Sequence, residues 1–172
     1  ALGHKDESPA RTQERAAGPP AERARAPKLS VALITYKQEG LIGPCLQSIL
    51  DQVVDFDLEI VVGEDCSPDG TLDVVRGFQE RHPGAIRVLH DRNHGITANF
   101  ARTILACTGE YVALAEGDDL WVDPRKLQLQ VDYLERHPDC AMSYHDVEVL
   151  AEATGVRTPY FGTIAGPKPA ER

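Results

Sequence analysis

The chain has 172 residues, of which 42% are hydrophobic and 26% are charged, and its formal net charge at pH 7 is −9. These proportions are typical of one globular domain and argue against a fibrous or wholly disordered chain. The acidic balance argues against nucleic-acid binding, which requires clustered lysine and arginine side chains. An anionic small ligand would need a cation to mediate its binding.

The first segment, residues 1–28, mixes alanine, proline, arginine and glutamate without a hydrophobic period. Such a segment cannot bury enough apolar surface to become ordered, so we predict that it is disordered. No apolar run in the sequence is long enough to span a bilayer, and the amino-terminal region lacks the apolar core of a signal peptide. We therefore expect a cytoplasmic protein, either free or held at a membrane by a partner.

The cysteines lie too far apart for the close pairs of a zinc site, so we expect four buried free thiols. They are Cys45, Cys66, Cys107 and Cys140. Four histidines show no metal-ligand spacing, namely His82, His90, His94 and His137. We interpret His145 as structural, Trp121 as a core residue beneath a loop, and Arg92 and Arg102 as solvated surface residues.

The structured part begins with a run of β-forming apolar residues, LSVALITY over 29–36, which predicts a buried parallel strand. Apolar residues then recur at helical spacing over 41–50, and a second strand is predicted over 58–64. The turn DCSPDGT precedes a predicted helix that ends at Pro83, with Asp69 or Thr71 as its expected cap.

The second half continues the alternation, with a short strand over 86–90, a helix over 97–107 and a strand over 111–116. The pair Asp123 and Pro124 predicts the start of a further helix that ends at Pro138. Residues 140–150 form a last strand candidate, and residues 155–172 look loose. Alternating strands and helices with short connections predict a right-handed, mostly parallel α/β sheet.

Acidic residues follow the predicted strands at the positions where open parallel sheets bind their ligands. Five carboxylates are expected to gather at this edge, namely Glu64, Asp65, Glu116, Asp118 and Asp119. Like charges so close together are costly unless a cation lies among them. Mg²⁺ and Mn²⁺ prefer carboxylate oxygens and keep positions open for phosphate oxygens. The pattern thus predicts a nucleotide diphosphate bound through a metal ion.

Three segments together resemble family 2 glycosyltransferases. EIVVGEDCSPDGT resembles their EIIVVDDGSTDGT-like signature, NHGITANFARTILACTGEYVALAEGDDLW resembles the segment that leads into their DxD-type motif, and DPRKLQLQVDYLERHPD is also similar. The resemblance covers roughly residues 29–150. It implies the nucleotide-sugar-binding portion of a GT-A fold, a Rossmann-like α/β architecture whose mostly parallel sheet is flanked by helices.

The resemblance also assigns roles by position. It implies nucleotide-sugar-binding roles for Thr35, Tyr36, Glu39, Glu64, Asp65, Asn93, Gly95, Asn99 and Glu116. Among these, Asp65 would contact the nucleobase, and Glu64 stands where the family usually has aspartate. The resemblance implies that Asp118 is the ligand for Mg²⁺ or Mn²⁺ and that Asp119 faces the donor sugar.

The implied reaction moves a sugar, with inversion, from a nucleotide-diphosphate donor to the hydroxyl of a saccharide, lipid or protein acceptor. In the family, the acceptor side and the general base normally lie in a carboxyl-terminal half, which we expect to be missing or much shortened here. No base motif follows Leu150. Asp146 and Glu148, just before it, are available carboxylates, but nothing in their spacing marks either as the base. Residues 151–172 are accordingly expected to be a poorly structured tail or the start of that acceptor-binding part.

The shortened length leaves a second function open, a truncated module that binds nucleotide sugar or assembles with a partner without transferring sugar. Two other enzyme classes fit less well. A sugar-phosphate nucleotidyltransferase would carry a glycine-rich basic loop after its first strand, where this chain has TYKQEG. A dehydrogenase would carry the glycine pattern G-x-G-x-x-G, which follows none of the strands.

Overall fold

The computed structural model describes residues 26–151 and 153–159. The elements are β1 (Leu29–Thr35), α1 (Ile42–Leu50), β2 (Leu58–Glu64), α2 (Thr71–Arg81), β3 (Ile86–Leu89), α3 (Ile96–Ala106), β4 (Tyr111–Glu116), α4 (Lys126–Arg136), β5 (Glu148–Ala151) and β6 (Val156–Pro159). The first four strands form one parallel sheet in the order β3-β2-β1-β4. The predicted α/β fold with a mostly parallel sheet is confirmed. The segment predicted to be disordered falls outside the described residues, apart from 26–28.

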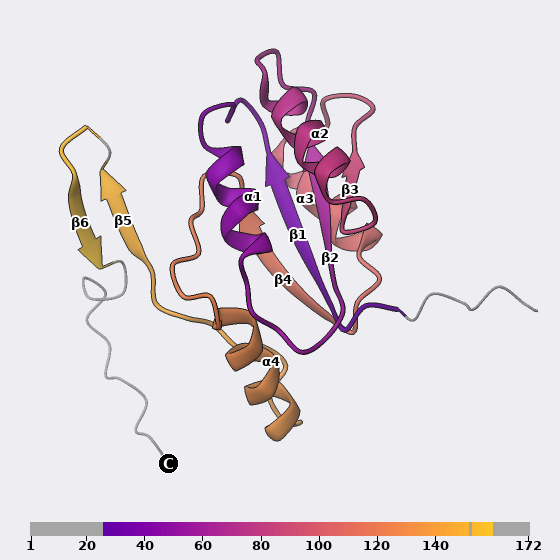
Figure 1. Ribbon diagram of the computed structural model, residues 1–172, viewed down its shortest axis with the longest axis vertical. Helices are drawn as coiled ribbons and strands as arrows, with labels where there is room; N and C mark the ends of the chain where they lie inside the picture. Colours follow the sequence, from indigo (N-terminus) through magenta and orange to yellow (C-terminus); the bar gives the residue numbers. More distant parts are fainter. Residues whose placement is uncertain (1–25, 152, 160–172) are drawn as a thin grey trace, which may run out of the picture.

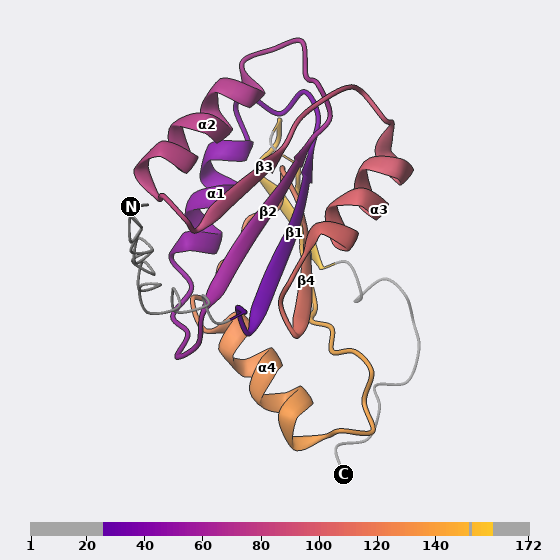
Figure 2. The same ribbon diagram turned by 90° about the vertical axis from the view of Figure 1, so that its right-hand side faces the viewer.

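Helices cover both faces of the sheet, as Figures 1 and 2 show. α1 and α2 lie against one face and α3 lies against the other. α4 lies below the sheet, where the strands begin. Lys28 forms an ion pair with Glu135 of α4 at 2.6 Å and another with Glu110, just before β4, at 2.9 Å. The opposite edge, where the strands end, carries the loops and is open to a ligand.

The core is centred on β1, whose seven residues are all buried. β1 has a parallel partner on each side and helices on both faces, so its side chains are apolar along nearly the whole strand. The largest fully buried apolar side chains are Leu33, Ile42, Leu46, Ile49, Ile60 and Leu127. The ends of β1, β2 and β4 are thus attached to the most rigid part of the molecule.

Gly63 lets α3 approach β2 closely. A side-chain carbon built at this position would collide with the Thr103 hydroxyl and would lie 2.8 Å from Oδ1 of Asn99. Asn99 Nδ2 donates a hydrogen bond to the Gly63 carbonyl at 2.7 Å, and Thr103 Oγ1 donates to the Asn99 carbonyl at 2.7 Å. The absence of a side chain at Gly63 therefore sets the distance between α3 and the sheet.

Gly63→Ala is accordingly expected to lower the free energy of unfolding by roughly 1–3 kcal/mol, because the added methyl group overpacks a buried contact. Urea denaturation of both proteins measures the change. Gly77→Ala, within α2, is the matched control, because the new carbon would meet only the end of the flexible Arg81 side chain, at 3.4 Å. Alanine also favours a helix over glycine, so this control should not lose stability. Equal stability of Gly63→Ala and wild type would contradict the close-approach interpretation.

Two helix starts differ from the sequence prediction. α4 begins at Lys126 and not directly after Asp123, because the Asp123 carboxylate accepts the Arg125 backbone N–H at 2.8 Å and closes a turn ahead of the helix. α2 begins at Thr71, so Gly70 takes the cap position that was predicted for Asp69 or Thr71. There the Asp69 carboxylate accepts both the backbone N–H and the hydroxyl of Thr71.

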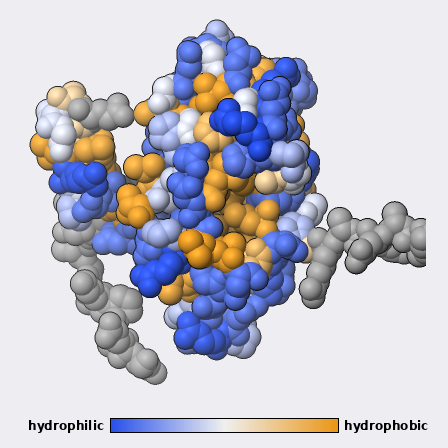
Figure 3. Space-filling model, in the orientation of Figure 1, coloured by the Kyte–Doolittle hydropathy of each residue, from blue (hydrophilic) through white to orange (hydrophobic). Residues whose placement is uncertain are grey.

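The carboxyl-terminal region also differs from the prediction. Within the strand candidate over 140–150, only residues 148–150 belong to a strand, β5 (Glu148–Ala151), which pairs antiparallel with β6. The expectation that residues from 155 onward are loose is therefore wrong for Val156–Pro159, whereas residues 160–172 lie outside the described part. In Figure 3, hydrophobic residues lie on this hairpin and in a band above α4, and Val149 and Val156 are among the exposed residues.

All four cysteines are free thiols, as predicted, but only Cys45 is buried, and the other three are partly exposed. Burial, together with the charges of Asp119 and Asp118, raises the pKa of the Cys45 thiol to about 12. Within the residues described, no helix combines the length and the apolar character needed to cross a membrane.

Candidate functional site

A cavity of about 410 Å³ opens at the carboxyl ends of the strands. It is lined by Ile34, Thr35, Tyr36, Gln38, Asp65, Asn93, Gly95, Ile96, Asn99 and Glu116. The strand order reverses between β1 and β4, since β2 and β3 continue on one side of β1 and β4 lies on the other. Open α/β sheets bind their ligands at such a switch point. Seven of the nine residues predicted to bind nucleotide sugar line this cavity, and Glu39 and Glu64 do not.

One wall of the cavity is built by two loops that are tied together. In the loop after β1, the backbone N–H of Lys37 donates to the Ser67 hydroxyl in the loop after β2 at 3.0 Å, and that of Gln38 donates to the hydroxyl of Thr71, the first residue of α2, at 2.9 Å. Glu39 lies in the same contact, since its carboxylate accepts the backbone N–H of Gly70 at 3.1 Å. Glu39 therefore joins the two loops in this structure.

Asp65 is held in place at the base of the cavity. Its two carboxylate oxygens accept the backbone N–H groups of His94 and Gly95 at 2.7 and 2.9 Å, and its carbonyl accepts the side-chain amide of Asn93 at 2.8 Å. Only 3% of Asp65 is exposed. Asp65 therefore lines the cavity and also joins β2 to the loop before α3.

Glu64 is fully buried and turns away from the cavity. Its carboxylate accepts the backbone N–H groups of Cys66 and Ser67 at 3.0 and 2.7 Å, and Oε2 lies 2.6 Å from Nδ1 of His90. These contacts close the turn that follows β2. The spacing of residues in the sequence could not reveal that His90 lies beside Glu64, because β3 brings His90 there from another part of the chain.

Arg102 is a structural residue and not a solvated surface arginine. Its guanidinium donates to the Glu64 carbonyl at 3.0 Å, to the Leu89 carbonyl at 3.3 Å and to the Asp91 carboxylate at 2.8 Å. Its Nε donates to Oδ1 of Asn99 at 2.9 Å. Arg102 therefore links α3 to the ends of β2 and β3, and Asn99 combines a place in the cavity wall with a packing role.

The end of β4 forms the other side of the site. Asp119 Oδ2 accepts the Glu116 backbone N–H at 2.9 Å, and the Asp119 backbone N–H donates to the Glu116 carbonyl at 3.0 Å. This reciprocal pair fixes the turn that presents Asp118 to solvent. Burial, together with the charges of Asp118 and Asp119, raises the pKa of the Glu116 carboxyl.

The five carboxylates do not form one cluster, contrary to the prediction. Glu64 and Glu116 pair with adjacent positions of β1 from opposite sides, so two strand spacings of roughly 5 Å each separate their backbones. Backbone N–H groups already satisfy Glu64 and Asp65. The uncompensated negative charge is therefore confined to Glu116, Asp118 and Asp119, with which no lysine or arginine among the described residues forms an ion pair.

Four residues that follow β4 in the sequence have structural contacts and no assigned chemical role. Trp121 packs against the core, in agreement with the prediction, and Lys126 lies over its ring at 3.7 Å. Burial lowers the pKa of Lys126 to about 8, against the opposing charge of Asp119. Asp146 and Glu148 are exposed; Asp146 accepts the backbone N–H of Val147, and Glu148 faces Arg157. Neither contact marks either carboxylate as a general base.

Comparisons with known proteins identify the family of this chain. The family described as "Glycosyl transferase family 2" matches residues 30–156, which is most of the chain. The chain belongs to glycosyltransferase family 2. An uncharacterized protein of Mycobacterium tuberculosis is 39% identical to it over 125 residues, which cover 72% of this chain and 36% of that protein.

Solved structures share the GT-A fold of this chain. The mannosyltransferase PcManGT from Pyrobaculum calidifontis, in complex with GDP-Man and Mn²⁺, has a TM-score of 0.56 and 28% identity over 64% of this chain and 33% of that one. Residues 1–349 of TarS from S. aureus, in complex with UDP-GlcNAc, have a TM-score of 0.56 and 28% identity over 64% of this chain and 32% of that one. The chain thus spans about a third of the length of the proteins that it resembles.

Proposed function

We propose that this chain binds the nucleotide-diphosphate sugar of an inverting, metal-dependent glycosyltransferase. The observation that carries the proposal is the cavity at the switch point of the sheet, where Thr35, Asp65 and Glu116 from three adjacent strands meet Asn93 and Gly95 from the loop before α3. Complexes of two neighbours with GDP-Man and with UDP-GlcNAc support this class of donor.

The cavity has distinct regions for the parts of such a donor. Tyr36 offers an aromatic ring that is 43% exposed, on which a nucleobase can stack, and the adjacent Asp65 supplies polar atoms at the base of the cavity. Glu116 also lines the cavity, and in this proposal its carboxylate accepts hydrogen bonds from ribose hydroxyls. The amino terminus of α3, with Gly95 before it, presents backbone N–H groups of the kind that bind phosphate groups.

The carboxylates after β4 suit Mg²⁺ or Mn²⁺. Their mutual repulsion contributes to the raised pKa of Glu116, and hard oxygen donors are those that these ions prefer. Asp118 is the proposed ligand, because Asp119 already holds the turn through the Glu116 backbone. When bound, the ion would stabilise negative charge on the leaving diphosphate. Asp119 would position the donor sugar by fixing this turn.

Transfer also requires an acceptor, which we predict to be a saccharide, a lipid or a protein, and a base that removes the proton from the acceptor hydroxyl. In this proposal, those functions belong to parts of the enzyme beyond the donor site, since the chain spans about a third of its relatives. Asp146 and Glu148 are carboxylates near the end of the predicted donor domain, and no contact marks either of them as this base. A cytoplasmic location, free or at a membrane through a partner, stays a prediction, as does the boundary of the donor domain near residue 150.

Calorimetric titration tests the donor site directly. UDP and GDP are titrated into the 172-residue chain in the presence of Mn²⁺ and again after chelation. We expect one of the two nucleotides to bind with Mn²⁺ and to lose at least about tenfold in affinity, or 1.4 kcal/mol, without it. Equal affinity under both conditions would show that nucleotide binding does not depend on a metal ion. No binding of either nucleotide would remove the donor site itself.

A further inference from the structure

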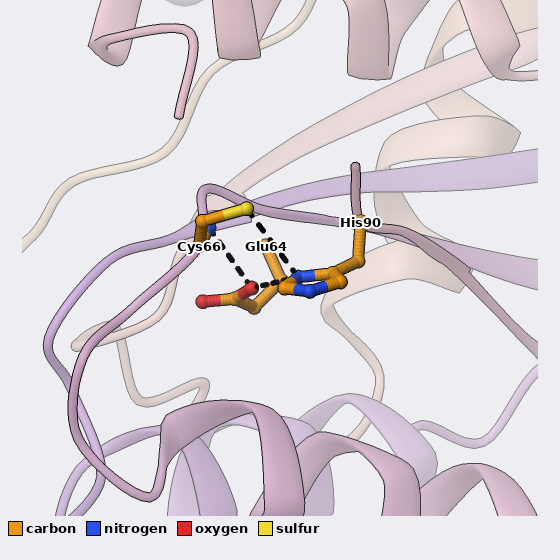
Figure 4. A group of neighbouring side chains, drawn as sticks. All are labelled: Glu64, Cys66 and His90. Carbon is orange, nitrogen blue, oxygen red and sulfur yellow. Dashed lines mark hydrogen bonds and ion pairs between the residues drawn. The ribbon is translucent and has the colours of Figure 1, made fainter. Parts of the chain in front are cut away.

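A second group of potential metal ligands lies beside the donor cavity. Glu64 at the end of β2, Cys66 in the loop after it and His90 after β3 point toward one another, as Figure 4 shows. Oε2 of Glu64 lies 2.6 Å and Sγ of Cys66 lies 3.8 Å from Nδ1 of His90. One donor atom from each residue lies within 4.8 Å of the other two. Two separate stretches of the chain thus converge on one point.

The donors suit a tetrahedral ion of the zinc class. Ligand distances of about 2.0–2.3 Å around tetrahedral Zn²⁺ place a sulfur and a nitrogen donor roughly 3.6 Å apart, close to the observed separation of Cys66 and His90. The shorter distance between Glu64 and His90 is that of a hydrogen bond with one proton between them. Replacing that proton with a metal ion requires a shift below 1 Å by the His90 ring, whose side chain is 29% exposed.

The surroundings favour a cation. The negative charges of Glu64, Asp91 and Asp65 all act on the Cys66 thiol, and the positive charge of Arg102 opposes them. The carboxylate of Glu64 is already oriented by two backbone N–H groups. Such outer contacts fix a ligand in the position that a metal ion needs.

Two residues of the cluster differ from the family signature, and in each case this chain has the longer side chain. The signature that the chain resembles reads DDGS where this chain has EDCS, so Glu64 replaces aspartate and Cys66 replaces glycine. Cys66 has a φ of 56°, a backbone conformation that glycine adopts without penalty and that costs other residues about 1–2 kcal/mol. The chain therefore keeps a thiol in a position where glycine would be more stable, which points to a role for that thiol.

We propose that Glu64, Cys66 and His90 bind a Zn²⁺-class ion, separate from the ion proposed at Asp118. Three protein ligands leave a fourth position for water. The thiolate and imidazole select softer ions than Mg²⁺ or Mn²⁺, so the two sites differ in metal preference. Bound there, the ion would join the loop after β2 to the loop after β3. The hydrogen bonds of Asp65 at the base of the donor cavity join the same two loops.

Zinc affinity and cobalt spectroscopy on the 172-residue chain test this site. We expect one Zn²⁺ per chain by competition with a chromophoric chelator, and Co²⁺ should give thiolate-to-cobalt absorption in the near ultraviolet. Cys66→Gly should remove that absorption and weaken Zn²⁺ binding by more than about 100-fold, because losing only an outer-shell partner costs 10–100-fold. Glycine suits the backbone at this position, so the variant should fold. His90→Gln should weaken Zn²⁺ binding in the same way.

Two controls separate this site from the rest of the molecule. Cys140→Ser removes another partly exposed thiol and should leave Zn²⁺ binding unchanged. Asp118→Asn should also bind Zn²⁺ as the wild type does, which makes the result independent of the donor site. Wild-type Zn²⁺ affinity in both Cys66→Gly and His90→Gln would overturn the proposal, as would a Co²⁺ complex without thiolate absorption.

Discussion

Asp118→Asn is expected to abolish metal-dependent binding of the nucleotide diphosphate, with a loss of more than about 100-fold, because even the loss of an outer-shell contact costs metal sites 10–100-fold. Asp118 is exposed on a turn that the Asp119 carboxylate and the Glu116 backbone hold rigid. The substitution removes a charged ligand without disturbing that turn. Glu116→Gln should cost less, about 1.5–3 kcal/mol, because it weakens a charged hydrogen bond to ribose.

The measurement is a titration with UDP and GDP across a range of Mn²⁺ concentrations, with folding checked by circular dichroism. Asp51→Asn is the matched control, since Asp51 is an exposed carboxylate at the far end of α1, away from the cavity. Its affinity should equal that of the wild type. Normal metal dependence in Asp118→Asn together with its loss in Glu116→Gln would reverse the two roles. No change in either variant would show that the proposed metal position is wrong.

Asp65→Ala is expected to lower both stability and nucleotide affinity. The Asp65 carboxylate accepts two backbone N–H groups in a buried position, and hydrogen bonds to charged groups contribute about 1.5–3 kcal/mol each. We therefore expect the free energy of unfolding to fall by about 2–4 kcal/mol without ligand. Nucleotide affinity should fall as well, since the loop that carries Asn93 and Gly95 loses its attachment to β2.

Urea denaturation of the unliganded protein and nucleotide titration under folding conditions measure the two effects separately. Asp65→Asn is the matched control for shape, since its amide oxygen still accepts one N–H whereas its amide nitrogen faces the other. It should lie between the wild type and Asp65→Ala in stability. If Asp65→Ala keeps full stability and loses only affinity, Asp65 is a ligand contact and its backbone contacts do not stabilise the fold.

The sequence was a good guide wherever periodicity and strand position determine structure. β1 and β2 appear where apolar runs predicted them, because a strand buried on both faces needs continuous apolar side chains. β4 also appears where it was predicted, although every second residue of this strand is exposed. The position of the cavity followed as well, since parallel strands with right-handed connections bring their carboxyl ends to one edge.

The interactions of individual side chains were less predictable. Sequence position placed Glu64 at the strand end but did not show that its carboxylate turns toward His90. Arg102 was interpreted as solvated because its partners are backbone carbonyls at Glu64 and Leu89, which no residue type reveals. The prediction that five carboxylates form one cluster was wrong because it also left out backbone partners. Neutral N–H groups of the backbone stabilise Glu64 and Asp65 without a metal.

The strand order has a consequence for how the protein is made. β1 is the centre of the sheet, yet one of its edges is covered only by β4, which pairs Leu29 with Tyr111. During synthesis, the amino-terminal strands emerge first, and that edge of β1 stays unpaired until β4 has been translated. An apolar strand with an open edge is a template for association with other chains. Folding of this domain should therefore be limited by this distant pairing, and nascent chains that stop before β4 should be the ones that chaperones retain.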